Sequence, residues 1–434
     1  MVSLAVSPVT APGSASAAWL ESVLRVFEPP LPVAVGASVG GLARHRTAAR
    51  DYLRRTGLPP TRKEAWRFTS LAPLIAVPPL VLSAPERRGL EPDHPPASKA
   101  LRLYWDGEHD PLDGVDLPEG LSRLESGVQD ALLGTVLEAA GTADSWLVSF
   151  NAALAFQVLA LRVRGRVAVP LELVSDCGQA TGVRPLRLLL LLEEDASLEF
   201  LQVHRAAGTS LASVVVEAQL APRSRLRHGV LAQGTDASCL LAHLAVSQAQ
   251  ASELDLTTVA GGWGLVRLEP AITQVHGNAS TRLRGLQVAC DRQIADLHSL
   301  VRFEGPEGQL DQLQKAVVDD AGRSVFHGAV QVPQAAQRTS ASQLSRNLLL
   351  CDRARVDAIP QLEIVADDVR CTHGATVTRL QQEELFYLRS RGLGADQAAR
   401  LLLEGFCDEI LTSLPESAFR WEPAVALLSK ALPR

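Results

Sequence analysis

The chain has 434 residues, 47% of them hydrophobic and 21% charged, which is a globular composition and excludes a disordered chain. At about 150 residues per domain, this length predicts two or three domains. The 42 basic and 48 acidic residues give a formal net charge of −6. A dedicated nucleic-acid-binding protein needs an excess of positive charge to displace counterions, so the charge balance excludes that class.

Membrane and targeting segments are not expected. The richest apolar run, Leu188–Leu192, stops at Glu193, far short of the roughly 20 residues that a membrane helix needs. The first basic residue is Arg25, which fits neither a signal peptide nor an Arg-rich transit peptide. The six cysteines are scattered, which excludes a disulfide framework and a Cys-x-x-Cys metal site. We therefore expect a soluble, cytoplasmic protein.

Residues 1–150 are expected to form an irregular, mostly helical domain. Apolar residues recur at spacings of three and four within Ser38–Thr56, where Ser38 would be the N-cap and Gly57 the stop. The other elements expected here are a helix at Leu20–Phe27, a loop at Ser83–Ser98, a strand at Leu101–Trp105 and a helix at Asp130–Ala139.

Residues 151–378 change to short runs of alternating apolar and polar residues between Gly, Pro, Asn and Asp. Leucines at the strand starts are spaced by 28, 28, 29 and 27 residues: Leu198, Leu226, Leu254, Leu283 and Leu310. A fixed period of 20–50 residues is typical of stacked repeats. Because each repeat consists of strands, we predict a parallel β-solenoid whose coils bury their apolar faces against one another. A β-sandwich is the alternative, but it would not require this spacing.

Residues 379–434 are expected to be helical. Gln381–Arg391 and Ala395–Leu414 place apolar residues at helical spacing, and Ala424–Leu432 would form a short last helix. A helical tail after a solenoid commonly caps it or carries a partner surface. The expected fold is therefore mainly β, with helical regions before and after a solenoid core.

Enzyme motifs are weak. None of the four lysines follows a glycine, so the chain has no P-loop, and no G-x-G-x-x-G follows a strand. Gly36–Gly40 satisfies the G-x-S-x-G nucleophile pattern, but no alternating strand–helix series surrounds Ser38 to form a hydrolase sheet. A small-residue loop that ends in an N-cap serine explains the same residues. A carbohydrate-active β-helix would need a cluster of carboxylates on one face, and the sequence does not supply one.

Cys371-Thr372-His373 is the strongest candidate for metal ligation. On a strand, Cys371 and His373 would point to the same face, because side chains alternate with a period of two. A thiolate and an imidazole suit iron or zinc, but they are two ligands and not four. From the residues alone, a buried thiol and a hydrogen-bonded histidine remain the alternative. Three further histidines are interpreted as core or turn residues: His276, His298 and His327.

Several long motifs occur in an order that is typical of one known family. In chain order they are Arg62–Thr69, Leu297–Ser299, Ser324–Gly328, Gln343–Leu350, Asp367–Val377, Glu384–Gly392 and Glu404–Phe406. Together they resemble the SufB/SufD family of the Suf iron–sulfur cluster assembly system. The resemblance touches all three parts of the chain and is dense from about residue 290 onward.

This resemblance implies a right-handed parallel β-helix and a scaffold subunit rather than an enzyme. In the family, SufD pairs with its paralogue SufB and with the ABC-type ATPase SufC, so the missing P-loop fits a chain that leaves nucleotide chemistry to a partner. The paralogues meet near the C-terminal ends of their β-helices, and the ATPase contacts the C-terminal helices. In this chain the expected ATPase-contact residues are Phe386, Tyr387, Arg389, Arg391 and Phe406.

Two positions resemble the SufD side of the family. SufB-like chains carry a cysteine where this chain has Ser345 and a glutamate where it has Gly374. His373 matches the histidine implicated in building a cluster at the SufB–SufD interface, and Cys371 is a supporting ligand, whereas Cys351 is interpreted as structural. The resemblance thus implies a transient iron–sulfur cluster or iron shared with SufB, and no bound nucleotide. Two alternatives stay open: a purely structural partner that ligates no metal, and a homodimer when the chain is alone.

Overall fold

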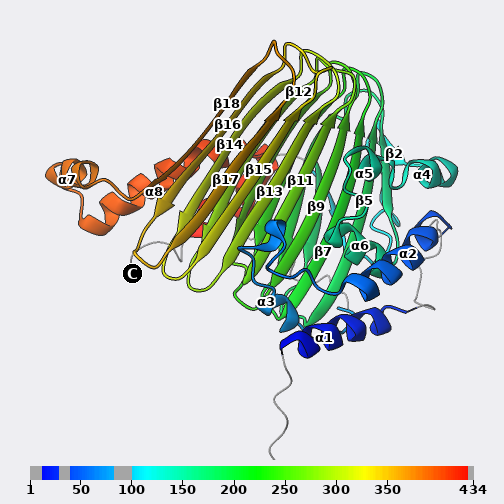
Figure 1. The fold of residues 1–434 in the computed structure, drawn as a ribbon, viewed down its shortest axis with the longest axis horizontal. Helices are drawn as coiled ribbons and strands as arrows, with labels where there is room; N and C mark the ends of the chain where they lie inside the picture. Colours follow the sequence, from blue (N-terminus) through cyan, green and yellow to red (C-terminus); the bar gives the residue numbers. More distant parts are fainter. Residues whose placement is uncertain (1–11, 29–39, 83–99, 429–434) are drawn as a thin grey trace, which may run out of the picture.

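Two parallel β-sheets form the body of the molecule (Figure 1). The computed structural model describes residues 12–28, 40–82 and 100–428. Within these residues each sheet has nine strands, and from β3 onward successive strands of the chain alternate between the two sheets. β2 and β3 pair antiparallel, and the other neighbouring strands pair in parallel. The predicted parallel β-solenoid is therefore confirmed, and the β-sandwich alternative is wrong.

The strands of each sheet follow one another along the solenoid axis. Sheet A contains β2 (Leu121–Arg123), β3 (Leu159–Val163), β5 (Gly182–Leu192), β7 (Ser210–Leu220), β9 (Cys239–Gln248), β11 (Leu265–Gln274), β13 (Ile294–Phe303), β15 (Arg323–Val332) and β17 (Arg355–Ile364). Sheet B contains β1 (Leu101–Tyr104), β4 (Leu171–Asp176), β6 (Ser197–Arg205), β8 (Arg225–Gln233), β10 (Glu253–Gly261), β12 (Ser280–Ala289), β14 (Gln309–Val318), β16 (Ser340–Leu349) and β18 (Arg370–Thr378). β17 and β18 therefore form the last coil.

The strand register corrects one step of the leucine repeat. Leu226 pairs with Leu254, as the spacing predicts. Leu254 then pairs with Thr281, and Thr281 pairs with Leu310. The step from Leu254 to its partner is shorter than the steps before and after it. The repeat position on β12 is therefore Thr281, and Leu283 lies two residues beyond it on the same face. The sequence spacing alone placed the wrong residue at this position of the repeat.

Alternate side chains of both sheets fill the interior of the solenoid. Most of them are Leu, Val, Ala and Phe, and they form one apolar core along the axis. Polar side chains also enter this interior, because the next coil offers a partner one strand spacing away. His228, for example, is buried, and its Nε2 lies 2.8 Å from Oε1 of Gln202 on the neighbouring strand.

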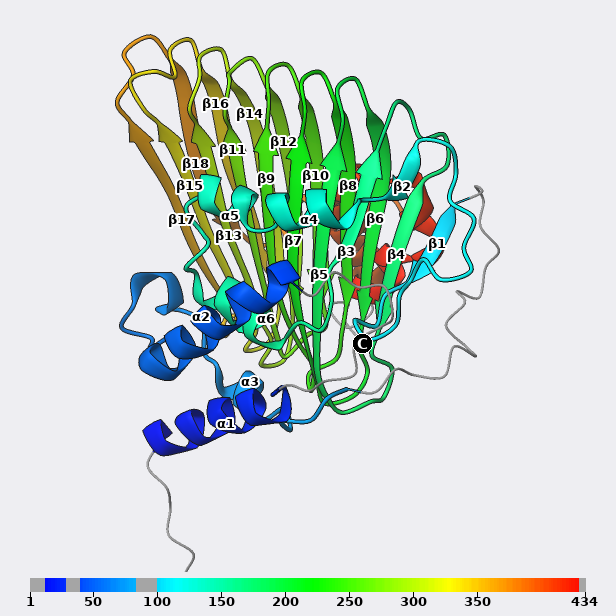
Figure 2. The same cartoon turned by 90° about the vertical axis from the view of Figure 1, so that its right-hand side faces the viewer.

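Helices from the N-terminal part cover the outer face of sheet A (Figure 2). They are α1 (Pro12–Val26), α2 (Gly40–Thr56), η1 (Glu64–Trp66), α3 (Ala72–Ile75), α4 (Ser126–Leu132), α5 (Thr135–Ala139) and α6 (Trp146–Leu154). Every residue of α6 is buried between sheet A and α2. Asn151 in the middle of α6 ties the helix to the sheet, because its amide N–H groups donate to the carbonyls of Leu186 and Ser213 at 3.0 and 2.9 Å.

The N-terminal part differs from its prediction at one helix and agrees with it at one strand. The expected helix at Asp130–Ala139 is split into α4 and α5 at Gly134, which has a φ of 91° and donates its N–H to Glu217 at 2.8 Å. The expected strand at Leu101–Trp105 is confirmed as β1, and it joins sheet B beside β4. The proposed N-cap Ser38 and the loop at Ser83–Ser98 lie outside the described residues, as does most of the G-x-S-x-G pattern.

Helices from the C-terminal part cover the outer face of sheet B. They are α7 (Gln382–Ser390), α8 (Ala395–Leu411), η2 (Glu416–Trp421) and α9 (Pro423–Leu428), so the three expected helices are confirmed within a few residues. Leu403 and Ile410 of α8 share an apolar cluster with Val259 and Leu286 of the sheet. Nowhere in the described ranges is a helix both long and apolar enough to cross a membrane.

Candidate functional site

The last coil of the solenoid, formed by β17 and β18, has no further coil packed on it among the described residues, and we call it the open end. Among the described strands, β17 has only β15 as a neighbour, and β18 has only β16. Both strands are exposed along much of their length, and three large apolar side chains lie in solvent here: Ile364 at 41% exposed, Val365 at 63% and Val377 at 51%. Unpaired strand edges with apolar side chains readily accept another chain. This end of the solenoid is visible at the left of Figure 1.

Cys371 and His373 lie on β18, at this open end. Cys371 pairs with Ala341 of β16 and packs against the apolar interior of the solenoid. His373, two residues further on, is on the same face of β18 and is exposed, since no coil covers it. The predicted shared face of the two side chains is therefore present. It is the interior face, at the point where the interior meets solvent.

The environment of Cys371 favours a protonated thiol in the chain alone. Burial raises the pKa of the Cys371 thiol, and a backbone hydrogen bond from Ala341 only partly offsets this. Because a metal binds the thiolate, ligation would have to displace that proton. The described residues hold no group of three or more His, Cys, Asp or Glu side chains that could bind a metal ion. Cys371 and His373 are thus two candidate ligands among the described residues, fewer than the four of a closed site.

A polar row continues from His373 into the solenoid. His373 pairs in register with Gln343, and Gln343 pairs with Gln312. Gln343 donates to Oε1 of Gln312 at 3.0 Å, and Gln312 donates to Oγ of Ser299 on sheet A at 2.8 Å. Ser345, the position of the SufB-type cysteine, is buried in the same interior. The amide of Asn347 donates to its hydroxyl at 2.9 Å.

The expected ATPase-contact residues fall into two groups. Phe386 and Tyr387 on α7 are 73% and 56% exposed, and the Arg391 guanidinium stacks on Tyr387 at 5.3 Å. Phe406 on α8 is half-buried instead and packs on the Lys315 ammonium, 4.6 Å from the centre of its ring. Lys315 also donates to the carbonyl of Phe406 at 2.7 Å. α7 is therefore free to contact a partner, whereas Phe406 helps to fix α8 on sheet B.

A buried charged network, which the sequence did not reveal, joins the N-terminal part to sheet A. The Arg267 guanidinium bonds Glu269 at 2.7 Å and Asp296 at 2.5 Å, and it donates to the carbonyl of Ala65 at 2.9 Å. It also stacks on Trp66 at 3.9 Å. Burial opposes the charge on Asp296, but the Arg267 guanidinium, His298 and the Thr69 hydroxyl together outweigh it and lower the pKa of that carboxyl. The motif Arg62–Thr69 thus anchors the N-terminal helices.

The three histidines interpreted as core or turn residues lie on other elements than β18. His298 and His327 pair in register on the outer face of sheet A, and their rings stack at 5.1 Å. Nε2 of His298 lies 2.9 Å from Asp296, next to the charged network. His276 lies in the turn after β11. None of these three histidines shares a strand with His373.

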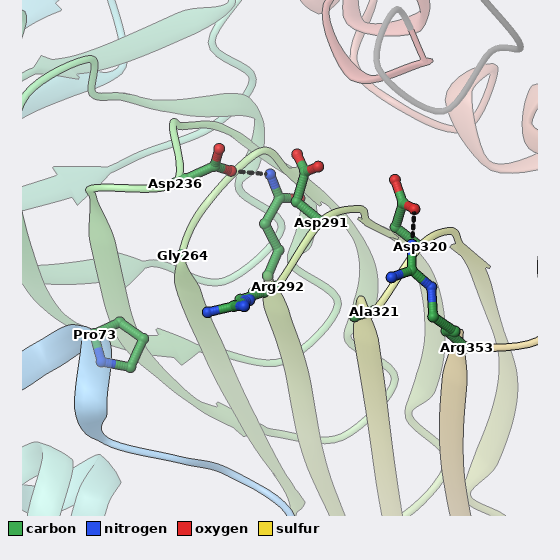
Figure 3. A pocket seen from close by; sticks show the side chains of 9 residues that line it. Pro73, Asp236, Gly264, Asp291, Arg292, Asp320, Ala321 and Arg353 are labelled. Atoms are coloured by element: carbon green, nitrogen blue, oxygen red, sulfur yellow. Dashed lines mark hydrogen bonds and ion pairs between the residues drawn. The ribbon is translucent and has the colours of Figure 1, made fainter.

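A cavity of about 530 Å³ lies at the turns beside α3 (Figure 3). Two hydrogen bonds join residues of its lining: Asp236 accepts from Gln293 at 2.5 Å, and Arg353 donates to Asp320 at 2.6 Å. The Sγ of Cys351 lies outside the cavity lining and donates to the carbonyl of Asp320 at 3.0 Å. That contact agrees with the structural role predicted for Cys351. The cavity lining contains no Cys or His among its described residues, so it does not fit iron or a cluster.

Comparison with known proteins agrees with this architecture. The model of the SUF system FeS cluster assembly SufBD core domain matches residues 177–406, from the end of β4 to α8. An iron–sulfur cluster assembly SufBD family protein of Synechocystis is 30% identical over 86% of this chain and 88% of its own length. The iron–sulfur cluster assembly protein SufD of Escherichia coli is 30% identical over 88% of this chain and 91% of its own. The chloroplastic protein ABCI7 of Arabidopsis thaliana is 31% identical over 70% and 68%.

Fold and sequence thus define one class, a β-solenoid protein of iron–sulfur cluster assembly. The chain belongs to the SufB/SufD family. Within that family, Ser345, Gly374 and the relative from Escherichia coli place it with SufD.

Proposed function

We propose that this chain is a non-catalytic scaffold subunit that assembles a transient iron–sulfur cluster together with a SufB paralogue and a SufC ATPase in the cytoplasm. The observation that carries the proposal is the open last coil, where His373 and Cys371 share one face beside unpaired strand edges. Two ligands and an incomplete β-structure occur at the same place. A second solenoid would complete both.

The paralogue is proposed to dock on the edges of β17 and β18. Their free backbone N–H and C=O groups can continue the two sheets into a partner, and Ile364, Val365 and Val377 would become buried. Each large aliphatic side chain contributes roughly 1.5–3 kcal/mol when it is fully removed from water. A SufB-type solenoid with the same strand spacing fits this edge. A second copy of this chain is the competing occupant when the chain is alone.

The cluster is the cargo of this interface, and His373 and Cys371 are proposed to supply part of its coordination sphere. Thiolate and imidazole are both iron ligands, and two from this chain leave positions for thiolates of the paralogue. A closed four-thiolate site would hold a cluster firmly. A site divided between two chains opens when the chains move, so it suits transfer to another protein.

The ATPase is proposed to bind at α7 and the adjoining part of α8. All nine residues of α7 are exposed or half-buried, and they include Phe386, Tyr387 and the cationic Arg389; Arg391 follows directly at the end of the helix. α8 continues from this surface onto sheet B, so a movement of α7 would be transmitted to the solenoid. The chain itself has no P-loop, so nucleotide would be bound by the partner.

Co-expression of this chain with a SufB paralogue and a SufC ATPase tests the proposal. Native mass spectrometry is expected to find one of this chain, one paralogue and two ATPases. His373→Ala should leave that mass unchanged but lower the iron and acid-labile sulfide per complex by about tenfold, since the complex loses a ligand.

Thr372→Ala is the matched control, because Thr372 lies on the same strand but on its other face. It should retain the cluster. A chain that stays alone would refute the partner assignment. Full cluster content in His373→Ala would refute the ligand role and favour a purely structural partner.

A further inference from the structure

Gln343 has an unused hydrogen-bond acceptor beside the proposed ligand. Its side chain is 2% exposed, and its Oε1 is buried and accepts no hydrogen bond from the described residues. Its amide N–H is already committed to Gln312, whose own amide N–H is committed to Ser299. The chain of hydrogen bonds therefore runs inward, away from β18. Oε1 of Gln343 is the free acceptor that terminates it.

The opposite sheet is shaped to hold this amide. Gly328 on β15 faces the interior, and a Cβ at that position would collide with Nε2 of Gln343 and with the ring of Phe326. Glycine is therefore required at 328 for the Gln343 amide to reach Gln312. Three residues on three strands, Ser299, Gln312 and Gly328, fix the orientation of one side chain.

His373 is the strand neighbour of Gln343. The two residues are paired in register on β16 and β18, and neighbouring parallel strands are about 4.8 Å apart, so their side chains leave adjacent backbone positions on one face. A neutral imidazole has one N–H to donate and one nitrogen to ligate. Histidines that bind metals almost always donate that N–H to a carbonyl or carboxylate oxygen, which fixes the ring and its tautomer.

We propose that Gln343 is a positioning residue for His373: its Oε1 accepts the imidazole N–H, holds one tautomer and directs the other ring nitrogen to the open end of the solenoid. The inference rests on the proposed function only for what that nitrogen binds. Oε1 of Gln343 is unpaired in this structure, so the bond requires the exposed His373 ring to turn toward it; both partners belong to this chain, so the bond is testable without a cluster.

The tautomer of His373 is the direct readout. In the full-length chain with ¹⁵N-labelled histidine, the chemical shifts of the two ring nitrogens report the tautomer, at a pH where the same spectra show the His373 ring to be neutral. His373→Ala identifies the signals. A hydrogen bond of ordinary strength should shift the tautomer ratio by about fivefold. Gln343→Met, which keeps the volume but removes the acceptor, should abolish that bias, whereas Gln343→Glu should retain it.

Gln314→Met is the matched control, because Gln314 is also a buried interior glutamine but lies on β14 and bonds Gln287. It should leave the His373 tautomer unchanged.

Gly328→Ala is a second test of the positioning role, since it displaces the Gln343 amide without removing it. It should also weaken the preference for one tautomer. Circular dichroism checks that each variant is folded.

An identical His373 tautomer ratio in the wild type and in folded Gln343→Met would overturn the positioning role. Failure of the proposed function has a different signature. If the tautomer depends on Gln343 but His373→Ala leaves cluster content unchanged in the complex, the positioning role stands and the ligand role falls.

Discussion

Histidines in this chain occupy opposite environments. His373 lies in solvent at the end of the solenoid, whereas His204 and His228 are enclosed in its interior. Burial lowers the pKa of His204 to about 4. Burial and, secondarily, the charge of His204 lower the pKa of His228 to about 3. Both interior histidines are therefore neutral in the folded chain at physiological pH.

The interior histidines predict acid sensitivity in a defined range. Below the ordinary histidine pKa of 6.5 the unfolded chain takes up protons that the folded chain cannot, so the free energy of unfolding should fall from pH 6.5 towards 4.5 and be maximal above 6.5. Each histidine contributes about 1.4 kcal/mol per pH unit in this range. Urea unfolding midpoints at several pH values would measure it.

A variant separates this effect from the titration of carboxylates. His228→Gln should remove about half of the slope between pH 6.5 and 4.5, because one of the two buried groups no longer titrates. His276→Gln, at a turn, should leave the slope unchanged. A midpoint that does not depend on pH in this range would show that the interior histidines are not neutralised by burial.

The helices of this chain are of two kinds: most pack against a sheet, whereas α7 does not. α8 is fixed to sheet B by its apolar face and by Lys315, which pairs with Glu409 at 2.6 Å. α7 has no such anchor and extends away from the sheet in Figure 1. The N-terminal helices resemble α8 in this respect, because Arg267, Asp296 and Thr69 tie them to sheet A.

Truncating α7 side chains should therefore affect binding and not folding. Phe386→Ala is expected to leave the melting temperature within about a degree, since a surface change costs at most a few tenths of a kcal/mol. It should weaken binding of the ATPase by about tenfold or more, as loss of a central aromatic anchor does. Titration of the purified ATPase by calorimetry measures this. Phe419→Ala, 48% exposed on η2, is the control, and equal losses in both variants would contradict the assignment.

The elements show what the sequence could and could not predict. Alternation and a period near 28 residues were sufficient for the solenoid, because stacked coils impose the same pattern on every repeat. They were not sufficient for the register at Thr281, since a turn can lose a residue without changing the alternation of the strands. Nor could they reveal that Arg267 and Asp296 are buried, because charged residues on alternate positions look like a solvated face until a helix covers them.

The site was only partly predictable for a similar reason. The spacing of Cys371 and His373 placed both on one face, but which face depends on pairing with β16, a contact between residues about 30 positions apart. Likewise Gln343, Gln312 and Ser299 are unremarkable as single residues. They become a connected row only when three strands are stacked.

In the molecule as a whole, helices lie on the outer faces of both sheets of the solenoid. The short β1 and β2 complete the first coils. Among the described strands, β1, β2, β17 and β18 are the edges of the two sheets, and the edge at β17 and β18 carries the candidate ligands Cys371 and His373. We propose that the paralogue joins the chain at this coil and that the cluster is built there.

Hydrogen–deuterium exchange of the chain, free and bound to a SufB paralogue, tests whether the paralogue docks on β17 and β18. The amides of β17 and β18 are at an exposed edge, so the account predicts rapid exchange in the free chain and strong protection in the complex, with little change in β5 to β9. Protection confined to the N-terminal helices or to the turns around Asp320, with β17 and β18 still exchanging freely, would contradict it.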